Sequence, residues 1–169
     1  MADEPMAGRT VLFRITHERY RDDPFSGEGG LRYGSRWASP GRRVSYAADH
    51  LATATLEKIA GVQRADLLSE MVFVRAEIDT AHVETLPRSR LPGNWNRLPA
   101  PASTRERGNA WLSENGRVPL LDVPSVVLPH SRNYVVDVEH PDASELTVTE
   151  TTPLLLDNRV LRQLGASLS

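Results

Sequence analysis

The feature that most constrains the fold is a set of short segments in which apolar and polar residues alternate. In residues 10–16 (TVLFRIT) the side chains of Val11, Phe13 and Ile15 share one face, and Arg14 projects from the opposite face. Residues 71–79 (MVFVRAEID) alternate in the same way. Side chains on a strand point in turn to the two faces of a sheet, so this period of two predicts half-buried β-strands.

Other segments complete a coarse map of the chain. Further strands are expected at 42–48, near 124–129, and at 133–138, 145–150 and 154–156. Helices are expected across 50–60, near 105–114 and at the C-terminal end, whereas 21–41, rich in Gly, Pro, Ser and Asp, is expected to be irregular loop. Because several strands follow one another without an intervening helix, the pattern predicts an α+β fold with a mainly antiparallel sheet and short flanking helices.

The helix expected at 50–60 has a recognisable start, end and apolar face. Asp49 is the expected N-cap, and Gly61 is expected to end the helix. An apolar stripe follows the helical spacing and consists of Ala52, Leu56, Ile59 and Ala60. Glu57 lies about 100° around the helix from Leu56. It is therefore expected at the edge of the stripe, facing out of the core.

Length and composition limit the class of protein. With 169 residues, 40% hydrophobic and 25% charged, the chain is expected to form one domain over 10–169 after a flexible tail at 1–9. It has no cysteine, which favours a reducing cytoplasm. No apolar run approaches the roughly 18 residues that cross a membrane. A formal net charge of −2 argues against direct binding of nucleic acid through its phosphates.

The common catalytic and metal-binding motifs are absent from the sequence. The five histidines (17, 50, 82, 130 and 140) lack the spacing of a helical metal site, and no metal is expected. The patterns GxxxxGK[ST], GxGxxG and GxSxG are also missing. Carboxylates, arginines, hydroxyls and aromatic rings remain as the groups from which a site can be built.

Arginine dominates the basic residues, with 19 arginines and one lysine. Six of these arginines lie in 88–117, among prolines and glycines, which predicts a long positively charged loop. A guanidinium binds phosphates and carboxylates in a bidentate manner, so the loop either steers an anionic ligand or is simply solvated.

Six motifs in this chain resemble those of the RES domain family. The first runs from FRIT at 13–16 through FSGEGGLRYGSRWASPGRRVSYAADHLATATLE at 25–57. The others follow in order: LPGNWNRLP (91–99), GNAWL (108–112), VPSVVLPHSRNYVVD (123–137), HP (140–141) and LLLDNRV (154–160). The likeness covers about residues 10–163 in register, and the order makes it specific although each motif alone is weak. One difference is GSRWA at 34–38, where the family pattern is GGRWN.

The resemblance implies a fold, a reaction and a set of site residues. The fold is similar to ADP-ribosyltransferases of the diphtheria-toxin type, with a split β-sheet, and NAD+ is consumed as the substrate, without a cofactor, by cleavage of its bond to nicotinamide. The family is named for an arginine, a glutamate and a serine, which match Arg36, Glu57 and Ser125. Tyr46 matches a further tyrosine of the family's site.

On this resemblance, each side chain suits a part of the reaction. Nicotinamide leaves as a neutral base, so no general acid is needed, and Glu57 is expected to stabilise the positive charge that develops on the ribose. Tyr46 offers an aromatic face to the nicotinamide ring. Arg36, which follows a glycine-rich loop, is expected to bind the pyrophosphate, and Arg14 is a second phosphate candidate.

Two further polar residues have alternative interpretations. Ser125 is interpreted as a group that positions ribose or carboxamide and not as a nucleophile, because no flanking histidine base is evident. The alternative is a buried serine satisfied by the backbone. Asn133 is either a site amide or a turn residue.

Three functions stay open on the sequence. The first is the toxin of a bacterial toxin–antitoxin pair that degrades NAD+, with water or phosphate accepting the ADP-ribose. The second is a toxin that transfers ADP-ribose to a protein, and the third is a non-catalytic module that binds its antitoxin. The resemblance implies an Xre-type antitoxin as partner and leaves the oligomeric state open, a homodimer within the toxin–antitoxin complex included.

Overall fold

The computed structural model describes residues 8–62, 64–114 and 117–165. Over these residues the strands are β1 (Arg9–His17), β2 (Val44–Ala48), β3 (Met71–Asp79), β4 (Val83–Thr85), β5 (Leu120–Pro124), β6 (Arg132–Asp137) and β7 (Thr147–Pro153). The α-helices are α1 (Glu28–Tyr33), α2 (Leu51–Gly61), α3 (Ala102–Ser113) and α4 (Asn158–Gln163). Short 3-10 helices lie at Glu18–Tyr20, Ala65–Glu70, Thr80–His82, Arg88–Arg90 and Pro141–Glu145.

The strands form one sheet in the order β4-β5-β6-β2-β1-β3-β7. Every neighbouring pair is antiparallel except β4 with β5. The mainly antiparallel α+β fold expected from the sequence is therefore confirmed.

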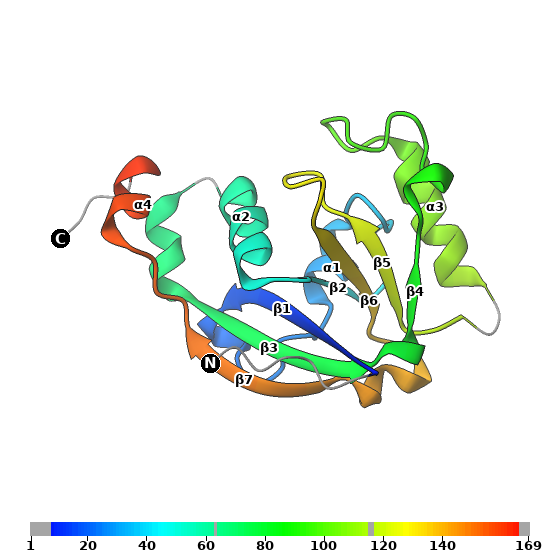
Figure 1. Ribbon diagram of the computed structural model, residues 1–169, viewed down its shortest axis with the longest axis horizontal. Coiled ribbons are helices and arrows are strands. Elements are labelled where there is room, and N and C mark those ends of the chain that lie inside the picture. Colours follow the sequence, from blue (N-terminus) through cyan, green and yellow to red (C-terminus); the bar gives the residue numbers. More distant parts are fainter. Residues whose placement is uncertain (1–7, 63, 115–116, 166–169) are drawn as a thin grey trace.

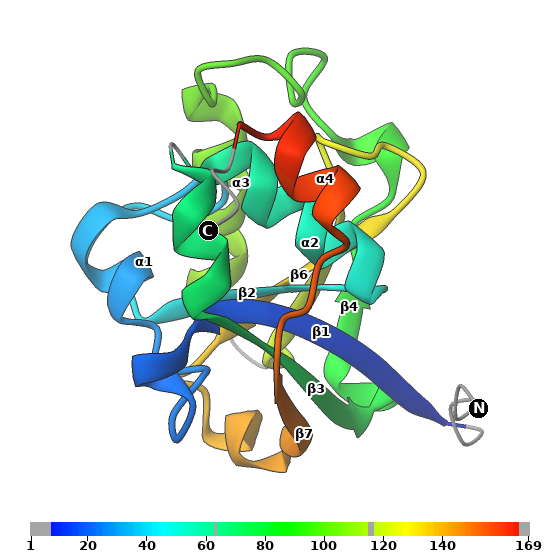
Figure 2. The ribbon, with the colours of Figure 1, turned by 90° about the vertical axis from the view of Figure 1, so that its left-hand side faces the viewer.

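The sheet is split between β1 and β2. These strands share a single paired position, Phe13 with Ala48, whereas β1 and β3 pair along the whole of both strands. Figure 1 shows the result: the antiparallel strands β1, β3 and β7 lie along one common axis, and β5 and β6 lie at a steep angle to that axis. Helices α2 and α4 lie on the same side of the sheet (Figure 2). The two halves diverge beneath α2, and this opening is where the cavity described below forms.

Strand β1 is covered on both faces, so the expectation of a half-buried strand is wrong for it. Leu12 is buried in one apolar cluster with Val74 and Ile78 of β3. Ile15 is buried in another, which includes Ala54 of α2. A central strand loses both of its faces to packing, and this position is not visible in its own alternation.

Helix α3 holds the turn at residues 35–39. The side chain of Asn109 accepts a hydrogen bond from the Ser39 N–H (3.0 Å) and donates one to Ser39 Oγ (2.8 Å). Arg105 Nε donates to the Ser35 carbonyl (3.2 Å). These contacts fix a turn that is flanked by Gly34 and Pro40 and lies outside the helices and strands.

Gly108 brings α3 into direct contact with this turn. A Cβ built on Gly108 would lie 1.7 Å from the Trp37 carbonyl oxygen, far inside any normal contact. Only glycine allows the helix and the turn to approach so closely. The GNAWL motif thus supports the turn that carries Arg36.

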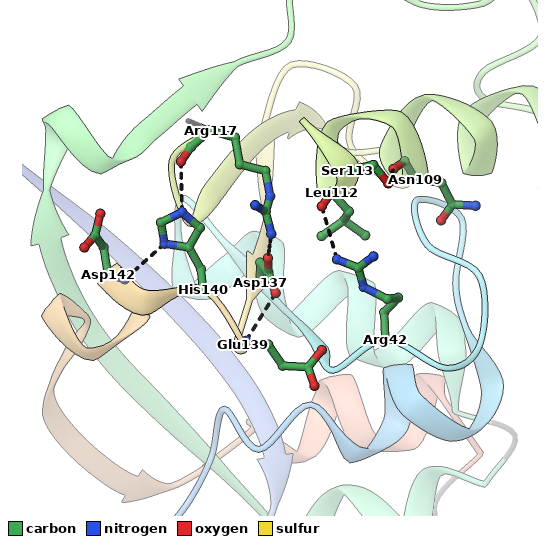
Figure 3. A network of polar contacts seen from close by, with 9 residues as sticks. All are labelled: Arg42, Asn109, Leu112, Ser113, Arg117, Asp137, Glu139, His140 and Asp142. Atoms are coloured by element: carbon green, nitrogen blue, oxygen red, sulfur yellow. Dashed lines mark hydrogen bonds and ion pairs between the residues drawn. The ribbon is translucent and has the colours of Figure 1, made fainter. Parts of the chain in front are cut away.

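A buried ion pair lies at the C-terminal end of β6 (Figure 3). Asn133 lies near the other end of this strand. Asp137 is 1% exposed and is paired with Arg117. His140 Nδ1 accepts a hydrogen bond from the Asp142 N–H (3.0 Å), so its Nε2 carries the proton and donates to the Arg117 carbonyl (2.8 Å). The HP motif at 140–141 therefore stabilises the fold at a distance from the cavity.

Several local expectations about secondary structure are wrong. The strand expected near 124–129 ends at Pro124, and the chain turns, with Ser125 Oγ accepting the Leu128 N–H (2.9 Å). Residues 154–156 form no strand in the described chain, although the Leu154 N–H still bonds to the Met71 carbonyl (2.9 Å). Within the expected loop at 21–41, residues Glu28–Tyr33 form α1.

Two boundaries also differ from expectation. The N-cap of α2 is His50, because the Asp49 carboxylate instead accepts the Arg132 N–H (3.0 Å) at the start of β6. At the N-terminus, Arg9 pairs with Asp79, and the Gly8 carbonyl accepts the Thr80 N–H (2.8 Å), so these two residues of the expected tail belong to the sheet region. Residues 1–7 lie outside the described chain.

The charged loop expected at 88–117 is wrong in its second half, where α3 (102–113) confirms the helix expected near 105–114. Three of its six arginines, Arg88, Arg105 and Arg117, have structural partners. The Arg88 guanidinium lies 5.5 Å from the centre of the Trp95 ring, and Arg117 is paired with Asp137. The segment is therefore not simply solvated.

We expect Gly108→Ala to destabilise the fold by about 3 kcal/mol or more, since the added methyl group meets a backbone carbonyl that cannot move without displacing the turn. Gly29→Ala, in α1, is the matched control, because a Cβ there has no neighbour within 4 Å. It should be neutral or stabilising by up to about 1 kcal/mol. Urea denaturation measures both, and equal midpoints for the two variants would contradict the close packing of α3.

Candidate active site

A cavity of about 300 Å³ opens where the sheet splits. Its walls come from β1, β2, the inner face of α2, and the segments around Ser35 and Pro124. Five of the six residues predicted for the site line it: Arg14, Arg36, Tyr46, Glu57 and Asn133. Ser125, the sixth, is fully buried behind Glu57.

The orientation of α2 is opposite to the one expected from its apolar stripe. Thr53 and Ala54 are the buried residues of this helix, whereas Leu56 is 41% exposed. Glu57 consequently faces inward and lines the cavity. Small side chains on the inner face let the helix approach the sheet, and the polar contacts of Glu57 hold that edge inward.

Two hydrogen bonds position the Glu57 carboxylate. Its Oε1 accepts from Ser125 Oγ (2.7 Å) and from Asn133 Nδ2 (2.6 Å). Within the described chain, Oε2 has no hydrogen-bond partner. Bonds to an ionised carboxylate are among the strong ones, so they fix its orientation and leave one oxygen available to a ligand.

Ser125 has its hydroxyl occupied on both sides. The oxygen accepts the Leu128 N–H, and the proton is donated to Glu57. The arrangement places this serine as a support of the carboxylate and not on the cavity wall. No histidine contacts its hydroxyl among the described residues, which is consistent with its interpretation as a hydrogen-bonding group.

Asn133 lies within β6, so the interpretation as a turn residue is wrong. Its Nδ2 bonds to Glu57, and its Oδ1 is buried with no hydrogen-bond partner among the described residues. A buried amide oxygen without a donor is costly to leave unsatisfied. The side chain of Asn133 lines the cavity, whereas this oxygen is itself buried.

Tyr46 presents its ring to the cavity and is held through its hydroxyl, which contacts Ser35 Oγ. Ser35 Oγ also accepts the backbone N–H groups of Trp37 (3.1 Å) and Ala38 (3.2 Å). Burial raises the pKa of Tyr46 to about 12, against the opposing effects of the Ser35 bond and of the Arg14 charge. Tyr46 is therefore a neutral phenol at physiological pH.

Arg36 joins the cavity to the segment 91–99. Its Nη1 donates to the carbonyls of Trp95 (2.8 Å) and Arg97 (3.0 Å). Burial lowers the pKa of Arg36, and the nearby charge of Glu57 opposes that shift. The remaining N–H groups of the guanidinium stay available for a ligand.

Arg14 is held by backbone carbonyls and not by a carboxylate. Its Nε donates to the Pro24 carbonyl (2.6 Å) and its Nη1 to the Tyr46 carbonyl (2.7 Å). Burial lowers its pKa to about 10, and Tyr46 acts in the opposite direction. The group remains a cation at neutral pH, and it forms no ion pair with any described residue.

Sequence reasoning missed two polar residues of the cavity. Ser35 bridges the 35–38 turn and Tyr46, and it stands in the GSRWA segment where a glycine was expected. Lys58, the only lysine of the chain, also lines the cavity. Two features of the sequence could have pointed to Lys58: it is the one lysine of the chain, and it follows Glu57 directly.

Comparison with known proteins identifies the family of this chain. The model of the RES domain family matches residues 11–157. The chain belongs to the RES domain family. It is 33% identical to "Toxin Res" of Yersinia enterocolitica over 77% of this chain and 85% of that protein. It is 31% identical to "Prs ADP-ribosylating toxin" of a Sphingobium strain, over 91% of this chain and 98% of the relative.

A solved structure shares the fold of this RES domain. It is the M. tuberculosis MbcT–MbcA toxin–antitoxin complex, with a TM-score of 0.68 and 19% identity. The match covers 92% of this chain and 88% of the matched chain. The overall fold of this chain thus recurs in a known protein.

Two structural findings bear on other classes of site. Over the described ranges, no group of three His, Asp or Glu side chains is arranged to hold a metal ion. None of the helices in those ranges combines the length and the apolar character needed to cross a bilayer.

Two buried serines of this RES domain make a matched pair. Ser125→Ala removes a donor from Glu57 and an acceptor from Leu128, and we expect it to cost about 1–3 kcal/mol of stability. Ser45 is equally buried, but its Oγ has no partner in the described structure. Ser45→Ala should therefore be neutral or stabilising in chemical denaturation. The bonding around Glu57 would be refuted by equal losses in the two variants.

Proposed function

We propose that this RES domain is the toxin of a toxin–antitoxin pair and that it degrades NAD+ by cleaving the bond between nicotinamide and ribose. The observation that carries the proposal is the Glu57 carboxylate, which is held at Oε1 and free at Oε2 within a cavity that also contains Tyr46 and cationic side chains. The names of the relatives support a toxin, and the family membership supports this reaction class.

The reaction needs little acid or base chemistry from the protein. The C–N bond breaks, its electron pair returns to the ring nitrogen, and neutral nicotinamide leaves. The ribose carbon develops positive charge, which the Glu57 carboxylate stabilises from a fixed position. Water then adds at that carbon and releases a proton, giving ADP-ribose; with phosphate as acceptor, the product carries the phosphate there instead.

The other cavity residues suit the two ends of the nicotinamide nucleotide. Tyr46 is a rigid aromatic surface on a strand and can stack against the nicotinamide ring. Arg36 has unused donors that can bind phosphate or carboxamide oxygen.

Transfer of ADP-ribose to a protein is the second candidate function. It is favoured by one observation, the match to the relative named as a Prs ADP-ribosylating toxin over almost its whole length. Purified protein incubated with NAD+ alone separates the candidates. Stoichiometric release of nicotinamide supports degradation, whereas labelled ADP-ribose that appears only on an added protein supports transfer.

An antitoxin is the proposed partner. The solved structure with the same fold is a toxin–antitoxin complex. An Xre-type antitoxin and a homodimer within the complex remain predictions from the family resemblance, as does a cytoplasmic location. Binding of operator DNA by this chain itself is not proposed, given its net charge of −2.

We expect Glu57→Gln to lower kcat for NAD+ cleavage by about 100-fold or more, because the amide keeps the shape but removes the charge. Nicotinamide release, followed by chromatography, measures the effect. Glu106→Gln on α3 is the control, because that residue is exposed and distant in sequence from the cavity residues. If Glu57→Gln retained normal turnover and toxicity, the role of Glu57 would be wrong and the proposal abandoned. If the wild-type protein released no nicotinamide, the non-catalytic function would be favoured instead.

A further inference from the structure

A second cavity, of about 520 Å³, adjoins the first. Its wall is formed by the end of β1, the segment after it, the end of α2 and the residues that lead into β3. Only two residues line both cavities, and they are the cations Arg14 and Lys58. The junction between the cavities is therefore positively charged.

Neither cation has an anionic partner. Arg14 bonds only to backbone carbonyls, and the Lys58 ammonium has no hydrogen bond or ion pair with any residue that the structure describes. Burial lowers the pKa of Lys58, and the neighbouring charge of Arg14 lowers it further. Two like charges kept partly buried and close together cost free energy unless an anion offsets them.

The second cavity itself carries no negative group. No aspartate or glutamate is among its lining residues within the described chain. Its wall combines hydrogen-bonding groups such as Thr16 and Ser26 with the apolar surfaces of Leu67 and Met71 and the ring of Tyr20. Such a mixture suits a planar base with polar edges.

We propose that Lys58 and Arg14 together bind the diphosphate of the dinucleotide and that the second cavity receives its adenosine half. This inference rests on the proposed function and extends it from the bond that breaks to the rest of the substrate. The first cavity, at about 300 Å³, has the size of the smallest ligand sites, so a dinucleotide has to extend beyond it.

The arrangement also reassigns Arg36. Two of its N–H contacts are with backbone carbonyls of the 91–99 segment. Arg36 lines the first cavity and does not line the second. Arg36 therefore serves the nicotinamide nucleotide, and the pair at the junction serves the diphosphate. Lys58 supplies a compact charge beside the planar guanidinium of Arg14, which suits the two phosphoryl groups.

Substitution of the single lysine tests the proposal. Lys58→Met keeps the aliphatic stem and should raise KM for NAD+ at least tenfold with kcat within about twofold, since the lost contact is remote from the reacting bond. KM for nicotinamide riboside, which has no phosphate, should not change. Lys58→Arg should restore most of the affinity for NAD+. Arg32→Met on α1 is the matched control for loss of one exposed cation, and it should change KM for neither substrate.

Binding of ADP provides a readout that does not depend on catalysis. ADP carries the adenosine and diphosphate without nicotinamide, and calorimetry should show at least tenfold weaker binding to Lys58→Met than to the wild type. If the wild type does not turn over NAD+ but binds ADP through Lys58, the proposed function fails and the diphosphate site stands. If NAD+ is cleaved and neither KM nor ADP affinity responds to Lys58→Met, the site is overturned. An equal rise in KM for NAD+ and nicotinamide riboside also overturns it, because it indicates a general disturbance of α2.

Discussion

One carboxylate oxygen, Glu57 Oε1, connects the two sides of the split sheet. It accepts one hydrogen bond from Ser125 in the turn after β5 and another from Asn133 in β6, while its own helix, α2, packs on β1. A carboxylate turned inward needs such donors, because an uncompensated charge in a protein interior is strongly unfavourable. These bonds explain why α2 presents Glu57 and not Leu56 to the interior, and why the turn at Ser125 replaces a continued strand.

The opposite wall of the cavity depends on support from far along the chain. The turn that carries Arg36 contacts helix α3, which is about seventy residues away in sequence. Arg105 and Asn109 form hydrogen bonds with this turn, and Gly108 packs closely against it. Within that turn, Ser35 holds the hydroxyl of Tyr46. Arginine and tyrosine are thus positioned by packing and backbone hydrogen bonds that contact no ligand, in keeping with the general need for functional groups to be supported by a rigid scaffold.

The distribution of charge around the cavities matches a ligand with a cationic group at one end and an anionic group in its middle. The walls of the first cavity include one carboxylate, Glu57, as well as Arg36, while Arg14 and Lys58 lie together at the junction with the second. NAD+ has a cationic ring at one end and a dianionic diphosphate between its two nucleosides. The chain as a whole is slightly acidic, so this complementarity is local to the site and does not follow from net charge.

The sequence by itself determined the elements whose signal is local. The alternation in 10–16 and 71–79 corresponds to β1 and β3, the run of strands without helices corresponds to the antiparallel sheet, and ordered motifs identified the family together with five residues that line one cavity. Tertiary structure alone decided which face of α2 is buried, because its apolar stripe competes with the hydrogen bonds of Glu57. It also decided that β1 is covered on both faces, that Ser35 supports Tyr46, and that Lys58 meets Arg14 between two cavities. These contacts join residues far apart in the chain, and no local period or spacing records such a meeting.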